Sequence, residues 1–334
     1  MLFRSRTPYH PSNSIIANFL FSTRSARTLA IAAYAAGGKV ELISERDRTA
    51  IRVTGPQWAR AGIDCSIVQF LNETPQTDPV ALRHAIAEAD RVPQPGFRES
   101  VEKDIERRVL GLQDAPTVSE GSLQELFSSN FGLDRAFVLA TGAPLNALKD
   151  LPARKSTATP RVFQTAGTGR GNLHYTPDAP TGSVIVAAPL QSIYFESWYS
   201  ALVLDRLIRQ VIPQVQTFLE PSIGAYYYRL EVPVPEGQFD DAVTEWLLGE
   251  LDRIYVSAPS ASGLESAKRS AMEYLESPKV VLWFQTLGVE AHRLEGMEYI
   301  RSITNDEVRA AARDLFMDPV IAGWSPKEIG RAHV

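Results

Sequence analysis

Apolar positions in the first third of the chain switch between helical spacing and the alternation typical of strands. Residues 24–36 are rich in alanine with helical spacing, and Gly37 and Gly38 follow, which is typical of a helix C-terminus. Residues 39–44 and 49–54 alternate apolar and polar side chains, so we expect the two strands of a hairpin. Helical spacing also predicts helices at 57–71, 80–90, 97–112 and 123–131, before a buried strand at 136–141.

The second half of the chain repeats this mixture of strand and helix patterns. Thr304, followed three residues later by Glu307, predicts a capping box in which each side chain satisfies a free backbone N–H group. We expect an α+β fold of two related domains, each an antiparallel-type sheet packed with helices. Strands are expected at 183–188 and 225–234, and helices at 196–211, 239–255, 264–275, 280–293 and from residue 304 onward.

Composition changes between the two halves and at both ends. The segment 152–172 carries several Pro, Gly and basic residues, which indicates a linker between a first domain at 6–151 and a second at 173–327. The end sequences MLFRS and EIGRAHV match what a common sequencing adapter encodes, so residues 1–5 and 328–334 are excluded from the predicted fold. We expect the natural chain to continue past both ends, which leaves the cellular compartment unknown.

Bulk composition excludes several classes of function. The chain is 44% hydrophobic and 22% charged, as expected of an ordinary globular protein. A net charge of -5 argues against a nucleic-acid partner, and no apolar run is long enough to predict a transmembrane segment. Cys65 is the only cysteine, which excludes an internal disulfide, and we expect it to be a packed residue rather than a reactive thiol.

Several segments, taken in order, resemble the pitrilysin/insulinase (inverzincin, M16-like) zinc peptidase family. Residues 32–56, AAYAAGGKVELISERDRTAIRVTGP, resemble the segment that follows this family's zinc motif. The second half resembles the family's C-terminal domain at YSALVLDRLI (199–208), at Gly224 to Tyr226, at VPVPEGQFDDAVTEWLLGELDRI (232–254), and at the closing helices 265–277 and 303–316. The resemblance implies the insulinase-type α+β fold in both halves.

The zinc motif of that family is missing where the resemblance places it. The family's His-x-x-Glu-His puts two imidazoles on one helix face to bind zinc, and its Glu acts on the bound water. The matching positions hold Ser14, Ala17 and Asn18, and the position of the third ligand matches Gln113. No cofactor is therefore expected, with zinc bound by a partner chain instead. The histidines supply no helical metal pair, because His10, His84, His174, His292 and His333 are far apart in sequence.

The remaining polar features favour structural roles. We expect His84 to be a solvated surface residue and His292 to lie at a helix end, where its charge suits the helix dipole. The acidic residues Glu102, Asp104 and Glu106 alternate with basic ones, which predicts a solvated helix face with i,i+4 ion pairs. None of these residues is expected to be catalytic.

The resemblance implies a non-catalytic subunit that helps a zinc-bearing homologous partner to enclose a peptide substrate. In the family, an Arg and a Tyr seven residues apart hold the substrate; Tyr226 matches the Tyr, the Arg position holds Leu219, and Arg229 is the alternative. Two other functions stay open. One is a zinc metalloendopeptidase whose motif lies elsewhere or was lost by truncation, and the other is a scaffold subunit that never contacts substrate.

Overall fold

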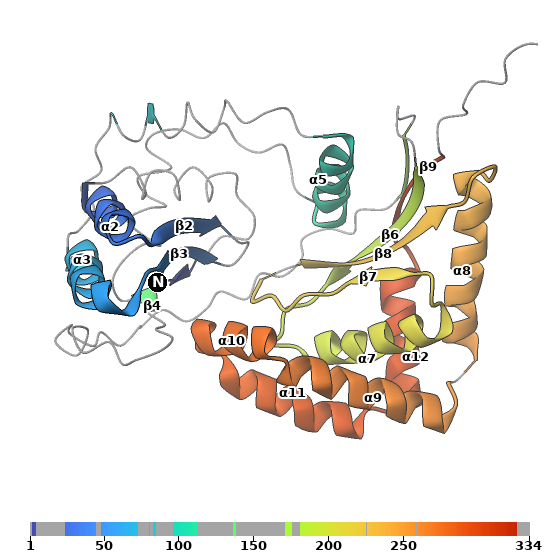
Figure 1. The fold of residues 1–334 in the computed structure, drawn as a ribbon. Helices are drawn as coiled ribbons and strands as arrows, with labels where there is room; N and C mark the ends of the chain where they lie inside the picture. The colour runs from blue at the N-terminus through green and yellow to red at the C-terminus, as the bar shows by residue number, and fades with distance from the viewer. Residues whose placement is uncertain are drawn as a thin grey trace, which may run out of the picture. The chain divides into compact units, whose positions relative to one another are not determined.

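The structure is a computed structural model, drawn in Figure 1. Contacts divide the chain into two units, which we describe separately: Met1–Gln94 with Asp114–Arg161, and Pro95–Gln113 with Val162–Val334. Among its described helices, none combines the length and apolar character that a membrane span needs. The structure describes residues 2–4, 24–44, 48–72, 80, 83–84, 96–111, 136–137, 171–175, 181–224, 226–257 and 259–325.

The first unit contains an antiparallel sheet with the strand order β2-β3-β1-β4. The predicted hairpin forms with Val40 opposite Val53 and Leu42 opposite Ile51, so its alternating apolar positions share a face. Strand β1, from the segment 1–5 that the sequence-based prediction left out of the fold, pairs with both β3 and β4. The strands are β1 (Leu2–Arg4), β2 (Lys39–Ser44), β3 (Arg48–Thr54) and β4 (Ala136–Phe137).

Two helices of the first unit, α2 (Arg24–Ala35) and α3 (Arg60–Asn72), follow the predicted spacing. A short 3-10 turn, η1 (Gln57–Ala59), precedes α3. Gly38 sits so close to β3 that an added Cβ would lie 2.1 Å from the carbonyl oxygen of Thr54. Cys65 is exposed, so the expectation of a packed residue is wrong: Ile63 and Phe70 supply the buried side of α3.

The second unit contains a five-stranded sheet with the order β5-β9-β6-β8-β7. The central strands β6 and β8 pair antiparallel along their full length, from Gly182 opposite Val234 to Leu190 opposite Tyr226. Only the β5–β9 pair is parallel among the described pairs of this sheet. The strands are β5 (Gly171–His174), β6 (Gly182–Leu190), β7 (Gln216–Phe218), β8 (Tyr226–Val234) and β9 (Val320–Trp324).

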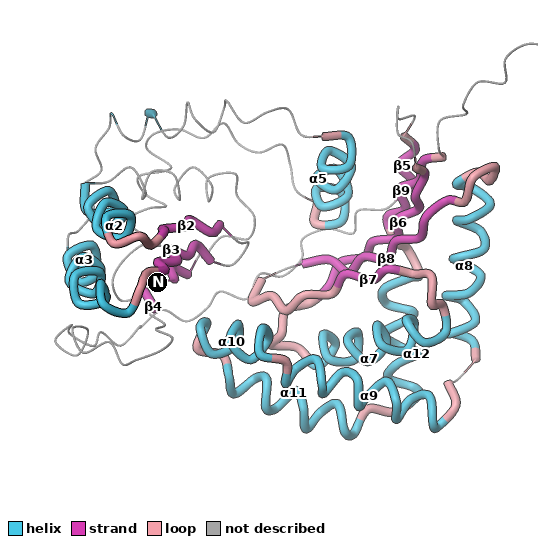
Figure 2. The backbone as a smooth tube through the Cα atoms, viewed as in Figure 1, coloured by secondary structure: helices cyan, strands magenta, loops and turns pink. Residues whose placement is uncertain are grey.

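Helices cover both faces of this second sheet. Alternate residues of β6, such as Val184 and Val186, contribute to a large apolar core with the helices of one face, and α7 runs through the centre of that core. A single described helix, α5 (Phe97–Val109), covers the opposite face, as Figures 1 and 2 show. The helices of the larger layer are α7 (Glu196–Val211), α8 (Asp240–Val256), α9 (Ala261–Glu276), α10 (Pro278–Leu287), α11 (Glu290–Ser302) and α12 (Asn305–Phe316).

The predicted α+β class is confirmed, and several elements match closely. The predicted helix at 196–211 is α7, and the capping box of Thr304 and Glu307 is present at the start of α12. The single helix expected at 280–293 is wrong, because Gly288 adopts a left-handed conformation (φ 66°) and ends α10 before α11 begins. The strands β7 and β9 were not predicted, and Gly171–His174 begins inside the segment expected to be linker.

The predicted boundaries at 6–151, 152–172 and 173–327 remain predictions. The two units of the structure are not two consecutive halves of the chain. Helix α5, which precedes residue 151 in sequence, packs with the second unit, while the segments on either side of it belong to the first. Most of the helices expected at 80–90 and 123–131 lie outside the described residues.

Candidate functional site

Tyr226, the residue predicted to contact substrate, is the first residue of β8 and lies opposite Leu190 of β6. Its side chain is half-buried, and its ring centroid lies 5.0 Å from that of Tyr227. Both rings pack against the apolar cluster that α5 forms with the sheet. Tyr226 therefore packs against the α5-covered side of the sheet.

Leu219, which occupies the family's Arg position, is a core residue with 6% of its surface exposed. Its carbonyl oxygen accepts a hydrogen bond of 3.2 Å from the Tyr274 hydroxyl. Arg229, the alternative, lies three residues after Tyr226 on β8, with Phe218 of β7 and Ala187 of β6 as its strand neighbours. Of these two positions, only Arg229 carries a guanidinium, and it lies on the same strand as Tyr226.

The guanidinium of Arg229 is engaged within the chain. Its Nη1 lies 2.8 Å from Glu102 Oε1, and its central carbon lies 3.8 Å from the centre of the Phe218 ring. Only 8% of the residue is exposed, and its Nε has no hydrogen-bond partner. Glu102 comes from α5, so this ion pair ties the helix to β8.

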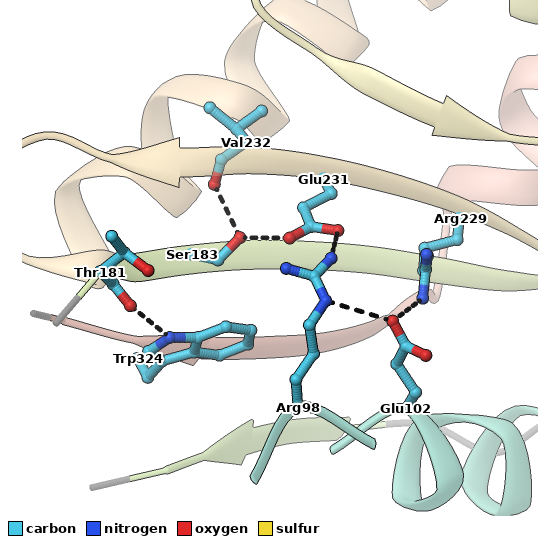
Figure 3. A network of polar contacts seen from close by, with 8 residues as sticks. All are labelled: Arg98, Glu102, Thr181, Ser183, Arg229, Glu231, Val232 and Trp324. Atoms are coloured by element: carbon cyan, nitrogen blue, oxygen red, sulfur yellow. Dashed lines mark hydrogen bonds and ion pairs between the residues drawn. The ribbon is translucent and has the colours of Figure 1, made fainter. Parts of the chain in front are cut away.

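A second ion pair extends the contact between α5 and the sheet (Figure 3). Arg98 Nη2 lies 2.6 Å from Glu231 Oε2, and Arg98 Nε lies 3.4 Å from the same Glu102 oxygen that Arg229 contacts. Ser183 Oγ donates to Glu231 Oε1 at 2.9 Å. Two guanidinium groups thus meet two carboxylates, and the network is neutral overall.

The prediction of a solvated face on α5 is right for part of the helix only. The i,i+4 pairs exist, with Lys103 Nζ 3.1 Å from Glu99 Oε1 on the exposed side. Glu106, however, is buried, and Glu102 pairs with the sheet, because the apolar residues beside them press this side of the helix onto β6 and β9. Asp104 accepts a hydrogen bond from Tyr175 at 3.2 Å, and burial together with this carboxylate raises the pKa of Tyr175 to about 12.

A separate polar cluster lies on the other face of the sheet, within the large core. Asp205 of α7 is fully buried and accepts hydrogen bonds of 3.1 Å from Tyr228 and from Arg209 Nε. Arg206 Nη1 lies 3.5 Å from the same carboxylate, and its guanidinium stacks 4.6 Å above the Tyr274 ring. Burial raises the pKa of the Tyr228 hydroxyl well above its usual value. The sequence pattern does not indicate this cluster. Asp205 and Tyr228 are fully enclosed, whereas the Arg209 side chain is 44% exposed, so the cluster ties α7 to the sheet from within the core to its edge.

The donor atoms at the motif positions do not fit zinc. Ala17 has no proton acceptor, and hydroxyl and amide oxygens such as those of Ser14 and Asn18 are poor substitutes for imidazole. These residues, with His10 and Gln113, lie outside the described residues. Within the described part of the chain, no group of three or more His, Cys, Asp or Glu side chains is arranged to hold a metal.

The described histidines also have no metal-binding arrangement. His84 is exposed, as expected. His292 is the third residue of α11, near its N-terminus, so the expected stabilisation by the dipole at a helix C-terminus is wrong. Its Nδ1 lies 3.2 Å from Glu295 Oε2, and its ring packs edge-on against Tyr194. This contact holds α11 to the loop after β6.

Comparison with solved structures assigns the fold. A protease from Helicobacter pylori superposes with a TM-score of 0.64 at 9% identity, over 97% of this chain and 92% of that one. The inactive M16 peptidase domain from Pseudomonas fluorescens gives 0.65 at 11% identity, over 97% and 91%. A protein named an M16-like peptidase from Alicyclobacillus acidocaldarius gives 0.68 at 12% identity, over 96% and 91%.

The fold is that of the M16-like peptidases. No family model matches the sequence, and no curated protein matches it. The likeness therefore rests on three-dimensional structure and covers nearly all of the chain.

Proposed function

We propose that this chain is a non-catalytic subunit of an insulinase- or processing-peptidase-type metallopeptidase. In this role it associates with a zinc-bearing homologous subunit and helps to enclose a peptide substrate. The observation that carries the proposal is the set of residues at the family's motif positions, where Ser14, Ala17 and Asn18 replace the two His ligands and the Glu. Zinc chemistry then belongs to the partner chain.

The fold supports the same proposal. An M16-like structure extends along 97% of this chain in the comparison with the inactive domain from Pseudomonas fluorescens. The chain keeps the fold in both halves but lacks the zinc-binding residues. This combination is expected of a subunit that binds a partner and does not itself catalyse peptide cleavage. Tyr226 is proposed to contact the substrate, since it matches the family's substrate-holding Tyr and is only half-buried.

Zinc content and peptidase activity test the first part of the proposal. Purified protein is dialysed, its zinc is measured by elemental analysis, and a pool of quenched fluorescent peptides is used to detect cleavage. We expect no stoichiometric zinc and no cleavage. About one zinc per chain with chelator-sensitive cleavage would overturn the proposal and establish the metalloendopeptidase alternative.

Partner binding tests the second part. The chain is co-expressed with a homologue from the same organism that carries His-x-x-Glu-His, and the two are co-purified through a tag on one of them. We expect a stable complex whose peptidase activity exceeds that of the homologue alone. A complex that forms without any change in activity, and in which Tyr226→Ala has no effect, would support the scaffold alternative instead.

A further inference from the structure

Arg229 presents a guanidinium whose hydrogen-bonding capacity is only partly used. Its Nη1 meets Glu102 at 2.8 Å, while its buried Nε has no partner. One face of the group lies 3.8 Å from the centre of the Phe218 ring, and Phe218 is itself 37% exposed. A planar guanidinium that stacks on an aromatic ring and keeps a free N–H group is well suited to binding a carboxylate.

Glu102 is the more loosely held of the two carboxylates in the network of Figure 3. Its side chain is 35% exposed, and one oxygen serves both Arg229 and Arg98. Glu231, by contrast, is 7% exposed and is bound by Arg98 at 2.6 Å and by Ser183 at 2.9 Å. An outward turn of Glu102 would break its contacts with Arg229 and with Arg98 Nε, while the 2.6 Å contact between Arg98 Nη2 and Glu231 does not involve Glu102.

An incoming carboxylate can replace Glu102 at no net cost in buried charge. Removing the partner of a buried guanidinium is strongly unfavourable, since an uncompensated charge is left behind. Exchange of one carboxylate for another keeps the guanidinium of Arg229 paired, and Glu102 moves into solvent, where it is hydrated. The exchange thus depends on the local concentration and geometry of the competing carboxylate.

We propose that Arg229, with Phe218 as its stacking partner, binds a peptide carboxylate, and that Glu102 is an internal competitor that occupies this site in the free protein. The inference rests on the proposed function and specifies the substrate class as peptides with an available carboxylate. Tyr226 begins the same strand, three residues before Arg229, and packs against the apolar cluster on the α5 side of the sheet. The carboxylate belongs to an Asp or Glu side chain or to the peptide C-terminus.

Peptide binding to the full chain tests the proposal. Three fluorescein-labelled hexapeptides are compared by fluorescence anisotropy: one with a single Glu and an amidated C-terminus, one with Gln and a free C-terminus, and one with Gln and an amidated C-terminus. We expect Glu102→Gln to bind at least one carboxylate peptide about tenfold more tightly than the unmodified protein does. The fully neutral peptide should bind both proteins alike. If the Glu peptide gains affinity, the site binds a side-chain carboxylate; if the peptide with the free C-terminus gains affinity, the site binds a C-terminal carboxylate.

A matched control removes the same charge from the same helix. Glu99→Gln, on the exposed side of α5, should leave all three affinities unchanged. In the Glu102→Gln background, a further Arg229→Gln change should abolish the gain. The proposal is wrong if Glu102→Gln gives no carboxylate-selective gain, or if the gain survives Arg229→Gln. Glu102→Asp, which keeps the charge on a shorter arm, provides a milder variant if Glu102→Gln fails to fold, and it should give a smaller gain of the same selectivity.

Failure of this inference and failure of the proposed function have different signatures. If carboxylate exchange occurs but no zinc-bearing homologue co-purifies, the binding site stands and the partnership does not. If the complex forms and Glu102→Gln leaves peptide affinity unchanged, the partnership stands and the Arg229 site does not.

Discussion

Tyr228 donates a 3.1 Å hydrogen bond to Asp205, joining the central strand β8 to helix α7 inside the core of the second unit. Both residues are almost fully enclosed, and Arg209 and Arg206 approach the same carboxylate. A buried carboxylate of this kind is tolerable only when it is paired and hydrogen-bonded. The cluster therefore fixes how α7 lies on the sheet.

Asp205→Ala is expected to lower the free energy of unfolding by about 3 kcal/mol, because it leaves the partly enclosed Arg206 without its counter-charge. Tyr228→Phe removes one hydrogen bond from the same carboxylate and should cost only about 1 kcal/mol. Urea denaturation followed by tryptophan fluorescence measures both. Equal costs for the two variants would show that the charge pair adds nothing beyond the hydrogen bond.

Gly296→Ala is expected to destabilise the protein although Gly296 lies within α11. Helix propensity favours Ala by about 1 kcal/mol. An added Cβ, however, would lie 2.0 Å from Tyr199 Cε1, and the Tyr199 ring is held by a 2.6 Å hydrogen bond from its hydroxyl to the carbonyl oxygen of His292. Overpacking of this kind typically costs about 1–3 kcal/mol, so the net effect should be a loss.

The control for this variant is Gly249→Ala, at an exposed position of α8 where an added Cβ meets nothing within 4 Å. That change should raise the free energy of unfolding by about 0.5–1 kcal/mol through helix propensity alone. Thermal unfolding of both variants is the measurement. A stabilised Gly296→Ala protein would mean that the Tyr199 ring moves aside at little cost.

Elements with a clear period were predictable from sequence alone. Helix α7 has a wide apolar face over several turns, and the strands β2 and β3 alternate along most of their length, so both were located to within a residue. Very short strands, and strands buried on both faces, show no clear periodic pattern of apolar and polar residues. Strand β7 has only 3 residues, and β9, with the sequence VIAGW, is covered on both faces and does not alternate.

The candidate site was only partly predictable, because its chemistry depends on contacts between distant residues. Tyr226 and Arg229 were identified through a family resemblance, but Glu102 was expected to face solvent. The pairing of Arg98 with Glu231 spans 133 positions and requires α5 to pack with the second unit, which local patterns do not encode. The only signal in the sequence was the apolar stripe of Val101, Ile105 and Val109 on an otherwise charged helix.

Thr304→Ala is expected to lower the free energy of unfolding by about 1 kcal/mol near neutral pH. The Thr304 hydroxyl accepts from the Glu307 backbone N–H at 3.3 Å, and a Glu307 carboxylate oxygen lies 2.7 Å from the Thr304 backbone nitrogen. Thr304→Ser keeps the hydroxyl and should lose much less. Chemical denaturation of the three proteins measures the difference, and equal stability of the Ala and Ser variants would contradict a capping role.

The same capping box should make stability depend on pH in the acid range. Hydrogen bonds from the Thr304 side chain and backbone lower the pKa of Glu307 in the folded protein below its usual 4.5. A depressed pKa means that the carboxylate stabilises the fold above about pH 4.5 and that this contribution is lost as the pH falls through the lower, folded value. At neutral pH the Glu307→Gln protein should have a lower free energy of unfolding than the unmodified protein. This difference between the two proteins should shrink as the pH drops below 4.5. A deficit independent of pH between 7 and 3 would rule out this contribution.

Gly288→Ala is expected to destabilise the junction between α10 and α11. Gly288 adopts φ 66° and ψ 31°, the left-handed conformation that ends many helices, and the backbone N–H of Val289 donates back to Phe284 at 3.0 Å. An L-residue with a Cβ enters this conformation at a cost of about 1 kcal/mol, whereas Asn tolerates it better than Ala does. Thermal unfolding should therefore rank the proteins Gly288, then Gly288→Asn, then Gly288→Ala. If Gly288→Ala instead equals or exceeds the unmodified protein in stability, residues 280–293 form one continuous helix, as the sequence pattern alone predicts.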